Sequence, residues 1–489
     1  MKAIVIGSGI AGLATAIRLA RMGYDTQVFE ANSFVGGKLS EFNINGFRFD
    51  RGPSLFTMPQ LVEELFELCG KNPAIEFPYI KLDESCRYFY ADGTLFRSFH
   101  ETSKLSQEVE EVFQVDAQVF LQHLQRSKNM HQYLSNIFME RSLHRLKNYL
   151  NTDTLKAVAH IPQLGLFDRL HDYHTKHIKH PKLVQYFNRF ATYNGSNPYK
   201  APATLHIIPH LEHGIGAFFP KNGMHQITNS LYQLAQQCGI QFHFNTPVTS
   251  IVTQKQKVSG VHTQLGFTEA EVVVSNMDVY HTYKKLMPQT KHPENILKQE
   301  KSSSALIFYW GIKTTFNNLG LHNIFFSDDY KREFEGISGE KEMHDDPTVY
   351  VNITSKHCKT DAPQGMENWF VMINVPHNNG QNWEQLMARA RQNIIQKLSN
   401  ILKVNIAEQI VAEQHWTPQG IESLTSSYKG ALYGNASNNK MSAFLRHRNQ
   451  SATYKNLYFC GGSVHPGGGI PLCLLSAKIV ADLLASAEQ

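Results

Sequence analysis

The chain begins with MKAIVIGSGIAG, residues 1–12, in which an apolar run leads directly into Gly7, Gly9 and Gly12. This GxGxxG pattern is typical of dinucleotide-binding folds, with a buried strand before the glycines and a helix after them. Gly7 allows the tight turn out of the strand, Gly9 lets the backbone approach a pyrophosphate, and Gly12 lets the helix pack on the strand. We therefore predict a strand, a phosphate-binding turn and a helix over Leu13–Met22.

The residues that follow complete the fingerprint. A second apolar strand, Asp25–Phe29, ends at Glu30, and an acidic residue at this distance typically binds the ribose hydroxyls of a dinucleotide. The N–H groups and the dipole at the start of the helix favour the negatively charged pyrophosphate. The strand, the helix and the acidic residue together predict a dinucleotide site rather than an ordinary Gly-rich turn.

Composition limits the class of protein. The 489 residues are enough for two or three domains, and the net charge of +5 comes from 47 basic and 42 acidic side chains without a basic block. We therefore predict no nucleic-acid partner. The six cysteines are scattered without a CxxC pair, which indicates reduced thiols in the cytoplasm. No apolar run is long enough to span a bilayer, so we expect any membrane contact to be peripheral.

Helix and strand patterns indicate an α/β protein with a discontinuous cofactor domain. Residues 1–75, 216–285 and 452–489 carry the fingerprint, the helix Gln226–Gln237, the strand Glu271–Ser275 and a last buried strand at 456–460. We assign residues 76–100 and 286–451 to a mixed-sheet substrate domain, because they hold strands rich in β-branched and aromatic residues. Residues 101–215 have helical spacing and are predicted to form a helical lid.

Three further Gly-containing segments have the chemistry of a flat cofactor site. The Gly36-Gly37-Lys38 turn follows Glu30 closely, so Lys38 could reach a phosphate, although a plain surface turn is the alternative. Gly52 and Pro53 fix an extended loop that could lie along a flat ring. The segment SVHPGGGIP, residues 463–471, has three consecutive glycines before a helix. Such a backbone surface without side chains suits a flavin ring.

These motifs together resemble one enzyme family. The segments GSGIAGLATAIRLA, FEANSFVGGKLSEF, RFDRGPSLFTMP and FCGGSVHPGGGIPLCLLSAK are similar to the bacterial carotenoid desaturases of the phytoene desaturase family. Two middle segments, YNGSNPYKAPAT and FFPKNGMHQI, are also similar, so the resemblance covers most of the chain. It implies a Rossmann-like FAD-binding domain of the flavin amine oxidase type, with FAD as the cofactor.

The resemblance also assigns cofactor-binding residues. It implies that the fingerprint residues hold the pyrophosphate, Glu30 lies at the ribose, and Val248 contacts the adenine side. The loops at Lys38, Pro53 and the C-terminal glycines would lie by the phosphates and the flavin. The complete predicted set is Gly7, Gly9, Ile10, Ala11, Gly12, Glu30, Ala31, Gly37, Lys38, Gly52, Pro53, Ser54, Val248, Asn276, Gly462, Gly469, Ile470 and Pro471.

The implied reaction removes two hydrogens from adjacent carbons of a long apolar polyene. One leaves as a hydride to the flavin N5 and the other as a proton, and the neighbouring polyene can delocalise positive charge, so a strong protein base is not required. His465 is a candidate proton acceptor, and its alternative role is to hold the loop by a hydrogen bond. Asp50 is likewise a candidate for holding the Gly52–Pro53 loop.

Within the family, GGKLSEF and GPSLFTMP are more similar to the 1-hydroxycarotenoid 3,4-desaturases. Phytoene desaturases more often have Arg at the position of Lys38 and Gly-Val where this chain has Leu472-Cys473. The resemblance therefore favours desaturation of a hydroxylated acyclic carotenoid, with oxygen or a quinone as the final electron acceptor. Phytoene desaturation, a flavin amine oxidase or protoporphyrinogen oxidase activity, and a non-catalytic carotenoid-binding flavoprotein remain alternatives. The sequence leaves the oligomeric state open.

A carotenoid substrate implies contact with a membrane surface, and the helical lid offers candidates for it. Phe138-Met139 and Leu164–Phe167 are possible apolar tips. The segment LHDYHTKHIKHPK places His171, His174, His177 and His180 at a spacing of three. A solvated basic face and a membrane-facing basic face with Lys176 and Lys179 are both open. A metal site is disfavoured, since no carboxylate–cysteine set accompanies the histidines, and we predict no metal.

Overall fold

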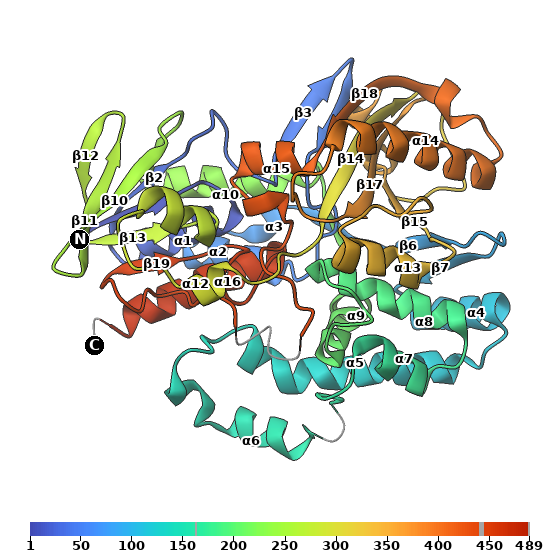
Figure 1. Cartoon of the computed structure of the whole chain (residues 1–489), viewed down its shortest axis with the longest axis horizontal. Coiled ribbons are helices and arrows are strands. Elements are labelled where there is room, and N and C mark those ends of the chain that lie inside the picture. Colours follow the sequence, from blue (N-terminus) through green and yellow to red (C-terminus); the bar gives the residue numbers. More distant parts are fainter. Residues whose placement is uncertain (162–163, 440–444, 488–489) are drawn as a thin grey trace.

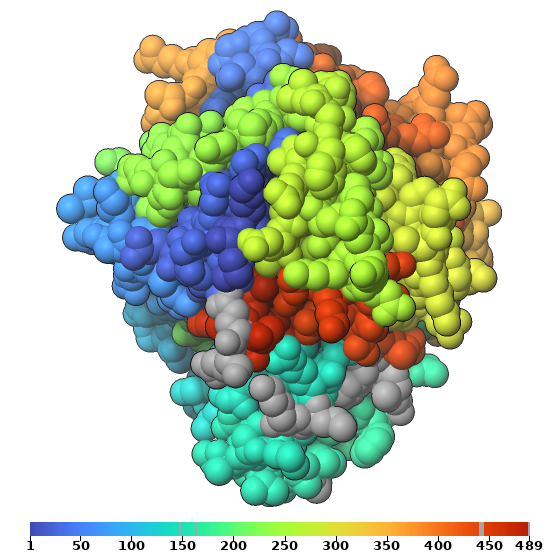
Figure 2. Space-filling view, turned by 90° about the vertical axis from the view of Figure 1, so that its left-hand side faces the viewer, coloured from blue at the N-terminus to red at the C-terminus, as the bar shows by residue number. Residues whose placement is uncertain are grey.

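The computed structural model describes residues 1–161, 164–439 and 445–487. Its first sheet is parallel, with the strand order β19 (Leu457–Phe459), β13 (Val272–Ser275), β1 (Lys2–Ile6), β2 (Asp25–Phe29) and β9 (Gln241–His243). β1 lies at the centre and pairs with both β2 and β13. The strands of this sheet therefore come from three separate parts of the chain, which meet on one face of the molecule in Figure 2.

The two faces of the parallel sheet are covered differently because side chains alternate along each strand. Ala3 and Val5 of β1 belong to a core to which four helices contribute: α1 (Ile10–Arg21), α2 (Gln60–Leu68), α10 (His225–Gln237) and α16 (Ile470–Ala485). Ile4 and Ile6 pack on the opposite side, against an antiparallel sheet of β10 (Val248–Gln254), β11 (Lys257–Thr263) and β12 (Gly266–Glu269). The α/β fold class is confirmed, and α1 begins at Ile10 rather than at the predicted Leu13.

The second large sheet is mixed and has seven strands. Their order is β18 (Ile410–Trp416), β14 (Ser304–Ile312), β17 (Glu367–Val375), β16 (Val349–Asn352), β15 (His322–Phe325), β6 (Glu84–Phe89) and β7 (Leu95–Phe99). Only β15 and β6 run parallel. Phe308 and Trp310 of β14 pack under α14 (Trp383–Leu402), which covers one face (Figure 1). Ile307 and Tyr309 point to the other face, where they pack with Phe47 and Phe49.

Two short strand pairs and several short helices connect these layers. The β3 (Glu41–Ile44) and β4 (Phe47–Asp50) hairpin packs on the mixed sheet, and β5 (Tyr79–Lys81) pairs with β8 (Phe218–Pro220). The remaining short helices in these parts of the chain are α3 (Pro73–Glu76), α11 (Val279–His281), η6 (Thr282–Leu286), α12 (Glu294–Leu297), α13 (Tyr330–Glu335), η7 (Gly336–Glu340), η8 (Thr354–Lys356), η9 (Lys359–Asp361), η10 (Ile406–Gln409), α15 (Pro418–Thr425) and η11 (Tyr428–Gly430).

A helical insertion lies below both sheets in Figure 1. Its elements are α4 (Thr102–Phe113), α5 (Ala117–Phe138), η1 (Leu146–Tyr149), α6 (Thr152–Ala159), α7 (Leu170–His177), α8 (Pro181–Asn188), η3 (Arg189–Asn194), η4 (Ala203–Ile207), α9 (Ile208–His210) and η5 (Leu211–Ile215). The domain bounds predicted from the sequence remain a proposal. Across the described ranges, no helix has both the length and the apolar character needed to cross a membrane.

Two expectations for the insertion need correction. Met139 and Leu164 were expected at apolar tips, but both are buried among other apolar side chains of the core. Phe167 is 74% exposed. The histidine run is not a solvated face: His174 is fully buried, and His171, His177 and His180 are only partly exposed. The reason is that α7 ends at His177 and turns one side toward α5 and α8.

Candidate functional site

One large cavity, of about 1050 Å³, lies between the two sheets and the helical insertion. The parallel sheet contributes its carboxyl-end loops, the mixed sheet contributes β14 to β17 side chains, and the insertion closes the remaining wall. Ligands in open α/β folds bind at the carboxyl ends of the parallel strands. The cavity therefore lies where the fingerprint predicts a cofactor.

All but two of the residues predicted from the sequence line this cavity. Those that do are Gly7, Gly9, Ile10, Ala11, Glu30, Ala31, Gly37, Lys38, Gly52, Pro53, Ser54, Val248, Asn276, Gly462, Gly469, Ile470 and Pro471. Gly12 and His465 lie outside the lining. The tertiary structure thus gathers residues from three distant segments, while their individual contacts with a cofactor remain a prediction.

Gly12 lies behind the turn, where its role is packing. A Cβ atom at this position would lie 2.1 Å from the carbonyl oxygen of Gly7. Gly7 has a φ of +92°, which L-residues rarely adopt, and its N–H donates to the Phe29 carbonyl. The close approach of helix and strand that the motif predicts is therefore present.

Glu30 is buried at the cavity wall and is held from both sides. Its Oε2 accepts hydrogen bonds from the backbone N–H and the hydroxyl of Ser8, at 2.8 and 2.7 Å. Its Oε1 accepts from the backbone and side-chain amides of Asn32, both at 2.9 Å. These four bonds fix the carboxylate at the position where an adenosine ribose is expected.

Two helix N-termini face the cavity without a side-chain cap. α1 begins after Gly9 and α16 begins after Gly469, and neither has an acidic residue in its first turn. Free N–H groups at both starts favour anionic or strongly polar groups of a ligand. A cavity of this size, with two such helix starts and several glycines in its lining, fits a dinucleotide such as FAD.

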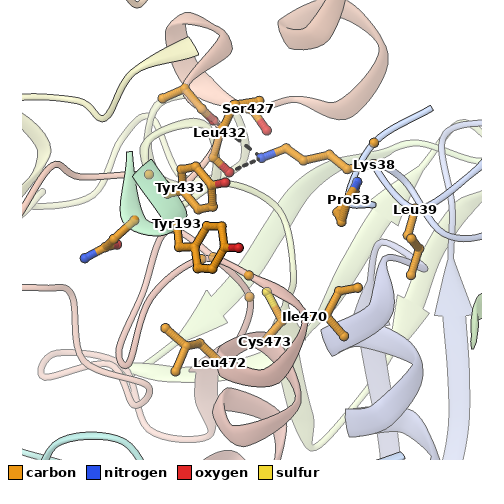
Figure 3. Close-up of a pocket in the computed structure, with 18 of the residues that line it drawn as sticks. Lys38, Leu39, Pro53, Tyr193, Ser427, Leu432, Tyr433, Ile470, Leu472 and Cys473 are labelled. Atoms are coloured by element: carbon orange, nitrogen blue, oxygen red, sulfur yellow. Dashed lines mark hydrogen bonds between the residues drawn. The ribbon is translucent and has the colours of Figure 1, made fainter. Parts of the chain in front are cut away.

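The ammonium group of Lys38 forms hydrogen bonds within the protein. Its Nζ donates to the carbonyl oxygens of Leu432 and Ala431, at 2.9 and 3.4 Å (Figure 3). Burial lowers the pKa of Lys38, and nearby Asp278 opposes this shift. In this arrangement Lys38 joins the cofactor loop to the segment after η11, and its predicted phosphate contact stays a prediction.

The side chains of Asp50 and His465 both form hydrogen bonds with backbone groups of distant segments. The Asp50 carboxylate accepts from the N–H groups of Met224 and His225, at 3.0 and 2.9 Å, and so caps the start of α10. His465 is 1% exposed, and its Nε2 donates to the Arg141 carbonyl at 2.9 Å. Burial lowers the pKa of His465 to about 3. This geometry favours the loop-holding role of His465 over that of a proton acceptor.

A chain of hydrogen-bonded polar groups lies in the cavity wall, and two of its members, Tyr350 and His322, were not predicted from the sequence. The Ser54 hydroxyl lies 2.7 Å from the Tyr350 hydroxyl, which lies 2.7 Å from Nδ1 of His322. Asn352 donates to the same Nδ1, at 3.2 Å. Because Nδ1 accepts these bonds, Nε2 carries the proton, and it has no hydrogen-bond partner among the described residues. No local motif marks His322 or Tyr350, since strand pairing and the packing of the loop after β4 bring them to Ser54.

Aromatic and thiol side chains complete the wall near the C-terminal glycines. Tyr193, Tyr433, Leu472 and Cys473 converge on the same space as Pro53 in Figure 3. Tyr193 comes from the helical insertion and Tyr433 from the segment after η11, so only the fold places them together. In the sequence, Tyr193 stood out only as part of a similar segment, while Leu472 and Cys473 stood out as a departure from the phytoene desaturase pattern.

The fold and the cavity are those expected of a dinucleotide-binding protein, and the comparisons identify the class as flavin-dependent oxidoreductases. The chain belongs to the family of flavin-containing amine oxidoreductases, whose model matches residues 10–485. The predicted FAD cofactor and oxidoreductase class are thereby confirmed. A putrescine oxidase variant of known structure has a TM-score of 0.64 and 12% identity, with 99% of each chain covered, which shows the shared fold.

Two curated relatives are similar over nearly the whole chain. A Flavobacterium protein named 1-hydroxycarotenoid 3,4-desaturase is 52% identical over 483 residues, covering 99% of each chain. A Staphylococcus aureus protein named 4,4'-diaponeurosporene oxygenase is 34% identical over 502 residues, covering 99% of this chain and 98% of the relative. The resemblance to carotenoid-modifying flavoenzymes is therefore confirmed.

Proposed function

We propose that this protein is an FAD-dependent desaturase that introduces a C=C bond at the 3,4 position of a 1-hydroxylated acyclic carotenoid. The observation that carries the proposal is the 52% identity, over 99% of both chains, to a protein named for this reaction. The residues around the fingerprint, Glu30 and the C-terminal glycines would hold FAD, which supplies a two-electron acceptor for the hydride. The sequence-based assignment of each cofactor contact belongs to this proposal.

The polar chain of Ser54, Tyr350 and His322 supports a hydroxylated substrate. In such a substrate, one carbon separates the hydroxyl-bearing C1 from the reacting C3–C4 bond, so the hydroxyl must lie close to the flavin. Ser54 follows Pro53, which the resemblance places beside the flavin ring. The Nε2–H of His322 has no partner among the described residues and is enclosed by neighbouring atoms, so a small rotation of the ring would bring it to the substrate hydroxyl. A buried donor left unpaired disfavours a substrate without a hydroxyl at this end.

The rest of the substrate wall suits a polyene. Ile307, Ile324, Phe370 and Met372 of the mixed sheet line the same cavity, together with Leu134 and Phe138 of the insertion. Apolar walls exclude water and hold a long chain by dispersion and burial rather than by hydrogen bonds. The protein thus orients the polyene through its shape and the reacting end through its polar groups.

We further propose that the helical insertion contacts the membrane surface. Leu150, Leu155, Val158 and Phe167 are exposed apolar side chains in and around α6, with exposed fractions of 86, 71, 56 and 74%. We call these four residues the α6 patch. Phe167 also lines the cavity, so a lipid-dissolved substrate could enter beside the patch. Peripheral attachment to the membrane is part of this proposal, and the scattered cysteines without a CxxC pair support placing it on the cytoplasmic side.

The test uses the FAD-loaded protein with carotenoid-bearing liposomes, under anaerobic conditions. A 1-hydroxylated acyclic carotenoid and phytoene are presented separately, and flavin absorbance, polyene absorbance and product mass are recorded. The proposal expects flavin bleaching and a product two hydrogens lighter only with the hydroxylated carotenoid. Bleaching by phytoene would assign phytoene desaturation instead, and incorporation of oxygen in an aerobic run would assign oxygenation. Bleaching by neither carotenoid would leave amine oxidation or non-catalytic binding.

A further inference from the structure

Three buried histidines meet within the helical insertion, away from the fingerprint. His123 lies on α5, His174 on α7 and His206 on η4, and the side chains of all three are fully buried. One ring nitrogen from each lies within 4.8 Å of those of the other two. The rings of His123 and His206 are the nearest pair, with centroids 4.1 Å apart.

The hydrogen bonds of His206 and His174 fix their tautomers. Nε2 of His206 lies 3.0 Å from the backbone oxygen of His123, which can only accept, so this nitrogen carries the proton. Nδ1 of His174 lies 3.0 Å from Oδ1 of Asn188 and carries the proton of that ring. The remaining nitrogens, Nε2 of His174 and Nδ1 of His206, face each other at 3.3 Å with a lone pair each.

Two lone pairs at this separation repel each other unless a cation lies between them. If the Asn188 amide were turned, its NH₂ group would face Nδ1 of His174, and the proton of that ring would move to Nε2, where it could donate to His206. Even then, both ring nitrogens of His123 would have no hydrogen-bond partner among the described residues. Burial lowers the pKa of all three histidines, which favours the neutral imidazoles that ligate metals. A metal-free network therefore accounts for two of the three rings.

We propose that His123, His174 and His206 bind one divalent transition-metal ion with a preference for imidazole nitrogen, such as Zn²⁺. Ligand nitrogens about 2.0–2.1 Å from a tetrahedral zinc are roughly 3.3 Å apart, as His174 and His206 already are. His123 completes the set by a side-chain rotation toward them. Asn188 and the His123 carbonyl act as the outer hydrogen-bond partners that orient metal-ligating histidines.

The ion would connect three segments that border the cavity. η4 contributes Thr204, Leu205 and Ile207 to the cavity wall, and α5 contributes Leu134 and Phe138. A metal ion that joins α5, α7 and η4 would stabilise this part of the cavity wall. The ion itself would lie away from the cofactor-binding residues. The spacing of the histidine run could not reveal the set, because only His174 belongs to it and its partners lie 51 and 32 residues away.

The test measures metal content of the untagged, FAD-loaded protein after dialysis against Zn²⁺ and then against metal-free buffer. Wild-type protein should retain about one zinc per chain, while His123→Gln and His174→Gln should retain at least tenfold less. His160→Gln, in which a partly exposed histidine near α6 is changed, is the matched control and should retain zinc like the wild type. Flavin absorbance reports folding of each variant.

A second measurement requires no variant. Dialysis against Co²⁺ should give visible absorption bands of a low-coordinate cobalt site, and X-ray absorption of the zinc-loaded protein should resolve imidazole ligands. Retention of less than a tenth of a zinc per chain by the wild type would overturn the proposal, as would equal retention by His123→Gln. Should the variants fail to fold, the ligand count from X-ray absorption decides between three histidines and a surface site.

Discussion

At the scale of single residues, the fingerprint glycine Gly12 allows a sharp test of cofactor binding. In Gly12→Ala, the new Cβ would lie 2.1 Å from the Gly7 oxygen, so α1 must move away from β1. Such overpacking typically costs about 1–3 kcal/mol. We expect the flavin-to-protein absorbance ratio of the purified variant to fall roughly tenfold. Gly339→Ala is the control, since nothing lies within 4 Å of its added Cβ. Equal flavin content in both variants would contradict the prediction.

Tyr350 tests the recognition of the substrate hydroxyl at the same scale. Tyr350→Phe removes the hydroxyl between Ser54 and His322 and leaves the ring in place. Losing one such hydrogen bond costs about 1 kcal/mol, so kcat/KM for the hydroxylated carotenoid should fall roughly five- to tenfold. Steady-state rates with hydroxylated and non-hydroxylated carotenoids measure this change in selectivity. An equal loss for both substrates would show that Tyr350 only supports the fold.

At the scale of elements, α6 and its neighbouring loops carry the proposed membrane contact. Leu155 and Val158 are exposed, so changing both to Ser leaves the core intact. Burying such side chains in lipid contributes about 1.5–3 kcal/mol each, and we expect sedimentation with liposomes to weaken at least tenfold. Ile75→Ser, at a residue 74% exposed on α3, is the matched control. Unchanged sedimentation of the double variant would place the membrane contact elsewhere.

At the scale of the whole molecule, buried neutral histidines make stability depend on pH. Burial lowers the pKa of His322 and His465 to about 3 and that of His447 to about 4. Below pH 6.5 the unfolded chain takes up protons that the folded chain excludes, so the free energy of unfolding falls as pH falls toward 4. Each histidine contributes about 1.4 kcal/mol for each pH unit in this window.

The measurement is the urea midpoint of the FAD-loaded protein at pH 7.5, 6.5 and 5.5. It should change little between the first two values and drop clearly at the third. Glu333 acts in the opposite direction, because burial raises the pKa of its carboxyl group to about 7 and protonation favours the folded state. A midpoint that rises at pH 5.5 would show that this carboxyl outweighs the histidines with a lowered pKa, which also include His210, His213 and His377.

The amino-acid sequence determined the local features that depend on neighbouring residues. Gly7, Gly9 and Gly12 after a β-branched strand specify a turn that few other residues can adopt, and they fixed the fold class and the dinucleotide site. The resemblance of the loops around Gly52 and Gly469 then predicted FAD. These inferences were possible because the glycines of each motif lie in one contiguous segment. Their spacing in the sequence therefore indicates the turn that they form.

The tertiary structure decided everything that depends on contacts between distant segments. Ser54 meets Tyr350 and His322 only through the pairing of β15 with β16 and the packing of the loop after β4 against that sheet. His123, His174 and His206 come together only through the packing of α5, α7 and η4. Packing between distant elements also buried Met139 and Leu164, which the sequence placed at apolar tips: Met139 lies in the core beside the parallel sheet, and Leu164 packs with residues of α5 and α7. Burial and long-range proximity arise from how elements pack, and no local spacing encodes them.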